Sequence, residues 1–207
     1  MTRSTRPAIV RAAVDRLRRG DAGFTYERLA ADAGVARQTL YSRFPDRAEL
    51  IIAAVDELRA EVPELDELTT AVQLAPSGRT ALEALLDLHV AFTPRMLNAL
   101  SAVEAQRAVS PGLSSAFERR ASGRRQLVRS VVTRLQAEGD LASGWSIDEA
   151  SDLLGALLTG AFAAELMNER RWSAAQLRHG LHRTLTRALL RPDQQAEPTT
   201  TNPGGPA

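Results

Sequence analysis

Two residue types are missing from this 207-residue sequence, cysteine and lysine. Without cysteine there are no disulfide bonds and no thiolate metal ligands. All 26 basic residues are arginine, which we interpret as a compositional bias rather than as a functional signal. Long apolar runs are missing too. Because none approaches the ~18–20 residues of a membrane-spanning helix, we expect no membrane span. The N-terminus carries Arg3 and Arg6 but no apolar signal-peptide segment, so we expect a cytoplasmic protein.

Signatures of catalysis are also lacking. The sequence shows no nucleophile beside a base, no phosphate-binding loop and no set of metal ligands. His179 and His182 have the spacing to share one helix face, but no third ligand is evident and several arginines surround them. His89 and Asp87 are two residues apart and would not face each other on a helix. We therefore expect no enzyme, no cofactor and no metal site, with solvated or interface histidines as the alternative.

The charge of the chain is distributed unevenly, although the net charge is only +1. Residues 1–47 contain ten arginines and five acidic residues, so this part carries +5 and the remainder carries −4. A basic end on a nearly neutral protein suits binding to the phosphates of nucleic acid. The alternative is an ordinary solvated helix face.

The stretch TYERLAADAGVARQTLYSRF, residues 25–44, has the spacing of a helix-turn-helix. The small side chain of Ala30 lets the second helix cross the first closely. Gly34 suits a left-handed residue just past the end of the first helix. Leu29 and Leu40 then face inward. This arrangement predicts two short helices that present a polar outer face.

The side chains left outside this core are able to bond base edges and phosphates. Arg37 can contact guanine and Gln38 can contact adenine, each worth ~1–3 kcal/mol of discrimination. The start of the first helix can hold a phosphate through its backbone amides, with a surface aromatic as the alternative for Tyr26. The DNA contacts predicted in this stretch are Thr25, Tyr26, Arg37, Gln38, Thr39, Tyr41 and Arg43.

Residues 5–58 resemble the N-terminal domain of TetR-family transcriptional regulators, which is about a quarter of the chain. The resemblance rests on IVRAAVDRL at 9–17 and on TYERLAADAGVARQTLYSRFPDRAEL at 25–50. Two positions depart from the family pattern. Ala36 stands where the family usually has Ser, which removes a side-chain N-cap worth roughly 1 kcal/mol. Gln38 stands where the family often has Gly, which adds a base-reading amide.

The resemblance implies a fold and a further DNA contact. Arg47 stands where the family usually has Lys and would be a phosphate contact. The fold expected is all-α, with an N-terminal three-helix helix-turn-helix domain and a C-terminal helical ligand-binding and dimerisation domain. We expect a helix-turn-helix domain at 1–47, a connecting helix at 48–60, the C-terminal domain at 61–192 and a disordered tail at 193–207.

Apolar periodicity and capping signals predict the helices themselves. Capping boxes are expected at Asp46–Glu49, Ser146–Glu149 and Ser173–Gln176. Residues 1–6 are expected to form a disordered arm or a frayed terminus. The predicted helices are 6–19, 26–33, 36–43, 47–60 and a short 64–74, followed by 79–92, 94–108, 111–138, 147–168 and 174–190.

The last two predicted helices suit a subunit interface. Residues 147–168 are apolar on nearly all sides, and the final helix carries leucines at i, i+4 spacing. In the resembled family these helices form a dimer, whereas the alternative is an intramolecular core. The predicted interface residues are Leu153, Leu157, Gly160, Ala161, Leu177, Leu181 and Leu185.

An effector pocket, if the family pattern holds, lies within residues 79–168. For each candidate taken singly, plain core is the favoured alternative, and His89 is the one polar group among them. The predicted ligand contacts are Leu86, His89, Phe92, Met96, Leu100, Phe117, Leu158 and Phe162. The function expected is a homodimeric repressor that binds a palindromic operator and is released by a small apolar ligand. The alternative is a DNA-binding regulator controlled by a protein partner or by its own abundance.

Overall fold

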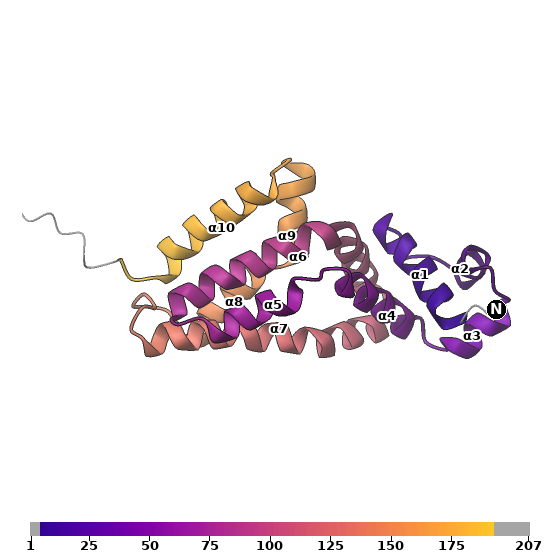
Figure 1. The fold of residues 1–207 in the computed structure, drawn as a ribbon, viewed down its shortest axis with the longest axis horizontal. Coiled ribbons are helices and arrows are strands. Elements are labelled where there is room, and N and C mark those ends of the chain that lie inside the picture. Colours follow the sequence, from indigo (N-terminus) through magenta and orange to yellow (C-terminus); the bar gives the residue numbers. More distant parts are fainter. Residues whose placement is uncertain (1–4, 193–207) are drawn as a thin grey trace, which may run out of the picture.

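The computed structural model describes residues 5–192, and all named elements within them are helices (Figure 1). The predicted all-α fold is confirmed. The predicted N-terminal arm falls partly, and the predicted tail wholly, outside the described residues. The helices are α1 (Thr5–Arg18), α2 (Tyr26–Ala33), α3 (Arg37–Arg43), α4 (Arg47–Ala60), α5 (Leu65–Leu74), α6 (Gly78–Arg107), α7 (Pro111–Ala137), α8 (Ile147–Leu157), α9 (Gly160–Ala164), the π-helix η1 (Glu165–Glu169) and α10 (Ala174–Leu189).

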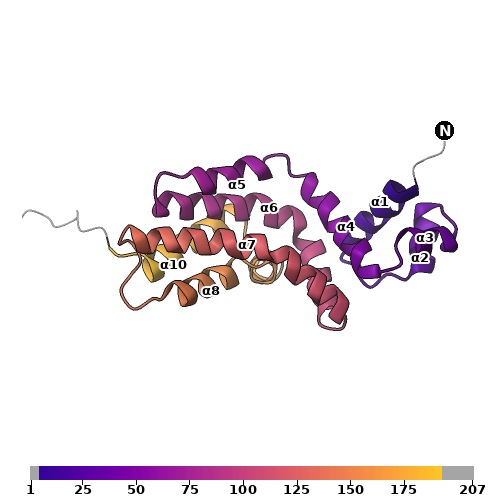
Figure 2. The ribbon, with the colours of Figure 1, turned by 90° about the horizontal axis from the view of Figure 1, so that it is seen from below.

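The molecule is elongated, with the short helices α1–α3 at one end (Figure 1). We call α1–α3 the N-terminal domain. Helix α4 leads from it toward the bundle formed by α5–α10, in which the two longest helices, α6 and α7, run side by side (Figure 2). Helices α5 and α10 pack on α6, and α8 packs on α7.

Polar side chains cap most helices at the predicted places. The capping boxes Ser146–Glu149 and Ser173–Gln176 are both formed. Asp46 caps α4 by accepting a hydrogen bond from the backbone N–H of Ala48 at 2.8 Å. Because no returning bond from the Glu49 side chain accompanies it, the capping box predicted there is wrong and the cap is a single bond.

The helices predicted at 79–92 and 94–108 form one helix, α6, with Pro94 inside it. Proline removes one backbone donor and crowds the preceding turn, which usually bends or ends a helix. Here the segments on both sides of Pro94 are held by packing against α5, α7, α9 and α10. Tertiary packing therefore carries the helix through a residue that would stop an isolated one.

The helix predicted at 147–168 is divided into α8, α9 and η1. It breaks after Leu157, and the hydroxyl of Thr159 caps a new start by accepting from the N–H of Phe162 at 3.2 Å. The chain leaves η1 through Arg171, which has a φ of 60°. No single described helix is long and apolar enough to cross a membrane; α8 with α9–η1, bent by 42°, meets that test only as a pair.

One hydrophobic cluster joins the N-terminal domain to the bundle. It contains the buried side chains of α1–α4 together with Met96 and Val103 of α6 and Leu113 of α7. Met96, Val103 and Leu113 are at most 1 % exposed. The N-terminal domain is thus connected to the rest of the chain by a shared core as well as by α4.

A second cluster fills the bundle between α6, α7, α8 and α10. Leu177, Leu181 and Leu185 lie in it and are at most 3 % exposed, so they are core residues of one chain and the predicted interface role is wrong for them. Gly160 is also covered from within, since a Cβ there would lie 3.0 Å from the Leu100 side chain. The i, i+4 leucines of α10 face inward because its opposite face is rich in polar residues.

Candidate nucleic-acid interface

The turn between α2 and α3 has the predicted geometry. Gly34 adopts φ 65° and ψ 36°, the left-handed region that glycine enters without steric cost. The hydroxyl of Thr25 caps α2 by accepting from the N–H of Arg28 at 3.4 Å. Leu29 and Leu40 are fully buried, which fixes the two helices on α1 and on each other. The helix-turn-helix is confirmed in these residues.

Helix α3 presents a polar outer face. Arg37, Gln38, Tyr41 and Arg43 are exposed, and Thr39 is half-buried. Ala36 precedes the helix without a side-chain cap, as predicted from its identity. Exposed arginine, amide and hydroxyl groups on one short helix can contact the edges of bases and the phosphates beside them.

Glu27 holds Arg37 in place. The two side chains form an exposed ion pair between the first turns of α2 and α3. A hydrogen bond from its own backbone N–H, together with Arg37 and Thr25, lowers the pKa of Glu27. Glu27 was not among the predicted residues, because acidic residues are common in the first turn of a helix, where they interact favourably with the helix dipole.

Tyr26, predicted as a DNA contact, has a partner within the chain, so the contact with DNA stays a prediction. Its side chain is 8 % exposed, and its hydroxyl donates to the backbone carbonyl of Phe44 at 2.8 Å. Burial raises its pKa to about 12. The hydroxyl therefore satisfies a carbonyl at the end of α3, while its ring lies 4.8 Å from the exposed ring of Tyr41.

Arg47 is directed inward and has partners within the chain, and the phosphate contact predicted for it stays a prediction. Its guanidinium donates to the carbonyl of Ala22 and lies 5.3 Å from the centre of the Phe24 ring. Its Nε is buried. Arg47 thus ties the start of α4 to the loop before α2 and stabilises the position of the helix-turn-helix.

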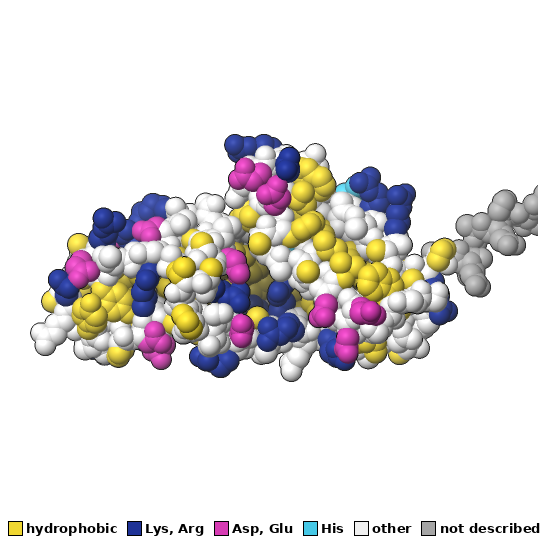
Figure 3. All heavy atoms as spheres, turned by 180° about the vertical axis from the view of Figure 1, so that it is seen from behind, with side chains coloured by type: hydrophobic (Ala, Val, Ile, Leu, Met, Phe, Trp, Pro, Cys, Tyr) yellow, Lys and Arg dark blue, Asp and Glu magenta, His cyan; other side chains and the backbone are white. Residues whose placement is uncertain are grey.

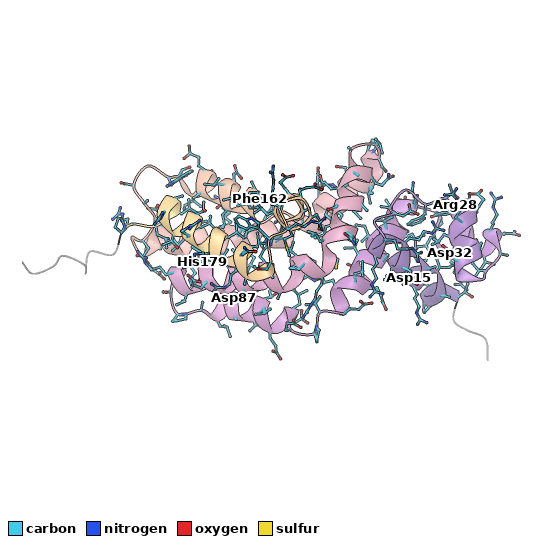
Figure 4. The ribbon with its side chains drawn as sticks, turned by 90° about the horizontal axis from the view of Figure 1, so that it is seen from above. Asp15, Arg28, Asp32, Asp87, Phe162 and His179 are labelled. Carbon is cyan, nitrogen blue, oxygen red and sulfur yellow. The ribbon has the colours of Figure 1, made fainter. Side chains whose placement is uncertain are left out.

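The residues predicted for an effector pocket are spread over both hydrophobic clusters. Leu86, Met96 and Leu158 are at most 5 % exposed, and Phe162 lies half-buried on α9 (Figure 4). Phe92, Leu100 and Phe117 are half-buried against the first cluster. A cavity of about 340 Å³ and a smaller one of about 70 Å³ are both lined by other residues. The predicted residues thus behave as packed core in this state of the chain.

His89 differs from its apolar neighbours because one ring nitrogen lacks a partner. Nδ1 lies 3.0 Å from the hydroxyl of Thr93, and Nε2 is buried without a hydrogen bond. Burial, and secondarily the charge of Arg124, lowers the pKa of His89 to about 4. Arg124 itself donates to the carbonyl of Leu158 at 2.9 Å, where α8 ends. His89 is therefore neutral at physiological pH.

The other two histidines, His179 and His182, lie on α10, and Figure 4 labels His179. His182 Nε2 lies 2.6 Å from the carboxylate of Glu83, so this side chain has a partner within the chain. Within residues 5–192 no group of three or more histidine and acidic side chains is arranged to hold a metal ion.

Comparison with known proteins relates the helix-turn-helix to a family. Residues 9–54 match the family described as "Bacterial regulatory proteins, tetR family". No curated protein matches the sequence significantly. The matched segment includes α2, the turn at Gly34 and α3, which are the elements that form the exposed polar face.

Solved structures of similar fold cover nearly the whole chain. FadR, a transcriptional regulator from Bacillus subtilis solved with stearoyl-CoA, aligns with a TM-score of 0.70 at 16% identity, covering 88% of this chain and 98% of FadR. Native NalD, the secondary repressor of the MexAB-OprM multidrug efflux pump in Pseudomonas aeruginosa, aligns with a TM-score of 0.65 at 23% identity, covering 90% and 97%. At these identities the likeness shows that the fold is shared.

Proposed function

We propose that this chain, whose N-terminal domain belongs to the tetR family of bacterial regulatory proteins, is a sequence-specific DNA-binding repressor that acts as a homodimer and is released by a small ligand. The observation that carries the proposal is the polar outer face of α3, set on the buried Leu29 and Leu40 by the turn at Gly34. Its site of action would be the cytoplasm, because a bacterial regulator meets its DNA there.

The exposed residues of α3 supply both readout and positioning. Arg37 can contact a guanine edge and Gln38 an adenine edge, while Tyr41 and Arg43 suit phosphates. One helix of this length reads only a few base pairs. Two copies related by a two-fold axis would read a palindrome whose half-sites are ~34–36 Å apart.

Apolar surface on the bundle supports the homodimer. Seen from behind, a band of hydrophobic side chains crosses the C-terminal part of the molecule (Figure 3). Leu153 and Leu157 of α8 are only half-buried, and Ala161 of α9 is exposed. Apolar surface of this kind is removed from water when a second copy covers it. These three residues remain our candidates for the interface after the α10 leucines are assigned to the core.

Ligand control is supported by the shared fold and by the irregular part of the bundle. FadR, which has this fold, was solved with stearoyl-CoA bound. In the present chain, the break after α8 and the π-helix η1 lie in the same bundle, and π-helical turns occur frequently at functional sites. A ligand that binds one conformation more tightly would shift the conformational equilibrium by the difference between its affinities for the two conformations. The two conformations would differ in the spacing of the two α3 helices.

A second candidate is a regulator without a small-molecule inducer, controlled by a protein partner or by abundance. The tight packing of Leu86, Met96 and Leu158 favours it, because a filled core leaves no room for a ligand. Thermal unfolding against a panel of small molecules separates the two, since a true ligand stabilises the folded state by mass action.

The proposal is tested by binding of the purified full chain to labelled DNA from upstream of its own gene, with excess competitor DNA and at two salt concentrations. We expect tight, competitor-resistant binding that Arg37→Ala weakens. Arg129→Ala is the matched control, because Arg129 is an exposed arginine of α7 that also pairs with a single acid, Asp148. Equal affinity for every DNA sequence would contradict the proposal.

The homodimer is tested separately by sedimentation. Leu157→Glu should shift the protein toward the monomer by placing a charge in the interface. Leu74→Glu is the control, since Leu74 is 78 % exposed on α5 and lies outside the proposed interface. A wild-type monomer at the concentrations that bind DNA would contradict the dimer.

A further inference from the structure

A surface cavity lies where the end of α1 meets the middle of α6 and the π-helix. Its volume is about 340 Å³, which is at the small end of the range for ligand sites. We call it the α1–α6 groove, and its wall includes Arg18, Pro94, Arg95, Asn98, Met167 and Asn168. Leu97, which belongs to the segment 79–168 where an effector pocket was expected, also lines it.

The chemistry of the groove is cationic and amide-rich. Arg18 and Arg95 contribute guanidinium groups, Asn98 and Asn168 contribute amides, and no carboxylate is among the described residues that line it. The apolar part of the wall comes from Pro94 and its neighbours. Guanidinium and amide N–H groups are donors that match the oxygens of a carboxylate or a phosphate.

Both arginines are available to a ligand. Arg18 pairs with Glu61 and lies 3.6 Å from Asp15 of its own helix, and Arg95 lies 2.5 Å from Glu64. None of these acids belongs to the wall of the groove. Their side chains are 48% and 52% exposed, and ion pairs of this kind contribute only about 0–1 kcal/mol. Each guanidinium also has five N–H donors, more than the two acids beside Arg18 or the one beside Arg95 engage. An incoming anion can therefore join or replace these pairs.

Two irregularities of the backbone meet in the wall. Pro94 lies inside α6 and leaves one backbone carbonyl of that helix without its usual donor. On the opposite side, Met167 and Asn168 belong to η1, which is followed by Arg171 in the left-handed region. Conformations this rare persist where the surrounding structure holds them, and they cluster at ligand sites.

The groove also contacts the connection between the N-terminal domain and the bundle. The amide of Asn98 donates to the backbone carbonyl of Arg18 at 3.1 Å, which fixes the end of α1 on α6. The side chain of Arg18 bonds Glu61 at the end of α4. A ligand that engages Arg18 competes with the contact that braces α1 against α4.

We propose that the α1–α6 groove binds a small molecule with a carboxylate or phosphate head and a short apolar body, and that its occupancy lowers DNA affinity. This regulatory role rests on the proposed function. The head is held between Arg18 and Arg95, with the amides of Asn98 and Asn168 as further donors. The coupling is reciprocal, so DNA binding weakens the affinity for the ligand by the same factor.

The test is isothermal titration calorimetry of the full chain, without DNA, against octanoate and octyl phosphate at constant ionic strength. Saturable binding of one acid per chain is expected, and the better of the two identifies the head group. Arg95→Gln should weaken binding about tenfold or more, because a charge-assisted hydrogen bond is lost. Arg129→Gln is the matched control, an arginine of similar exposure with one acidic partner.

A second variant keeps the result decisive if Arg95→Gln fails to fold. Asn168→Asp places a negative charge in the wall, on an exposed residue, and should abolish binding of the acids. Absence of saturable binding by the wild type overturns the proposal. So does equal binding of 1-octanol and of the acids, or binding that neither variant changes.

Measuring operator binding as well distinguishes failure of the groove proposal from failure of the proposed repressor function. If the chain binds its operator and no acid binds the groove, the regulator stands and the groove is overturned. If the acids bind and depend on Arg95 while no DNA is bound specifically, the groove stands as a binding site and the proposed function fails. With both shown, octanoate should lower operator affinity in the wild type and leave it unchanged in Arg95→Gln.

Discussion

Acidification should destabilise this protein through a single buried side chain, His89. Its imidazole is 8 % exposed, with Nδ1 beside the hydroxyl of Thr93 and Nε2 without a partner. Burial, with a smaller contribution from Arg124, lowers its pKa from 6.5 to about 4. Between these two values the unfolded chain carries a proton that the folded chain does not, so unfolding takes up a proton and stability falls as the pH falls.

The magnitude follows from the difference between the two pKa values. Above pH 6.5 neither state is protonated at His89, and its contribution is at its maximum. Below that value the free energy of unfolding decreases by about 1.4 kcal/mol per pH unit until the folded pKa is approached. The loss expected between pH 8 and pH 5 is therefore about 2 kcal/mol. Carboxylates add little above pH 5, which makes this window the informative one.

The assay is urea unfolding followed by circular dichroism at fixed protein concentration, at pH 8 and at pH 5. Wild type should lose about 2 kcal/mol more than His89→Gln, because glutamine keeps a polar group but does not titrate. His179→Gln is the matched control, because it replaces a histidine that is exposed on α10 and leaves His89 in place. An equal loss in wild type and His89→Gln would refute the reasoning, because His89 would then titrate alike in both states.

Three further predictions concern the close approach of Gly78 to α7, the hydrogen bond of Tyr26 and base discrimination by Arg37. Gly78→Ala should lower the free energy of unfolding by about 1–3 kcal/mol, because the new Cβ would lie 2.7 Å from a backbone nitrogen of α7. Gly123→Ala is the control: nothing lies within 4 Å of its Cβ, so it should raise the free energy of unfolding by about 1 kcal/mol. Both changes are measured by urea unfolding. Tyr26→Phe should lower the free energy of unfolding by about 1 kcal/mol, because it removes the bond to the carbonyl of Phe44, and should leave DNA affinity unchanged. A large loss of affinity at full stability would instead identify the Tyr26 hydroxyl as a DNA contact. Arg37→Ala should reduce discrimination at one base step by about 1–3 kcal/mol, measured by competition with singly substituted operators, and unchanged discrimination at every step would contradict the placement of α3.

The helix-turn-helix was predictable because its determinants are adjacent in the sequence. Thr25 caps α2, Gly34 ends it, and Leu40 sets the inward face of α3, so spacing alone gives helix bounds within a residue of those observed. The same local reasoning failed at Pro94, where packing from other helices decides the outcome. It also failed after Leu157, since nothing in an apolar run specifies a π-helix.

The candidate site was predictable in its outline and not in its partners. Spacing identifies which side chains of α3 point outward, and Arg37 is among them. It does not identify the carbonyls that satisfy Tyr26 and Arg47, because those belong to residues brought close only by folding. The α1–α6 groove could not be predicted from the sequence for a similar reason, because Arg18 and Asn168 are far apart in the chain and only folding brings them together.

The shared core that contains Met96, Val103 and Leu113 along with the side chains of α1–α4 has a thermodynamic consequence. Opening the N-terminal domain alone would expose those side chains of the bundle to water, so the two parts should melt in one transition rather than in two. The exposed face of α3, which we propose reads DNA, is then held by the same core as the long helices α6 and α7. An effector of the kind proposed would therefore displace α3 by moving α4 and α6 together, because within residues 5–192 these helices share one core.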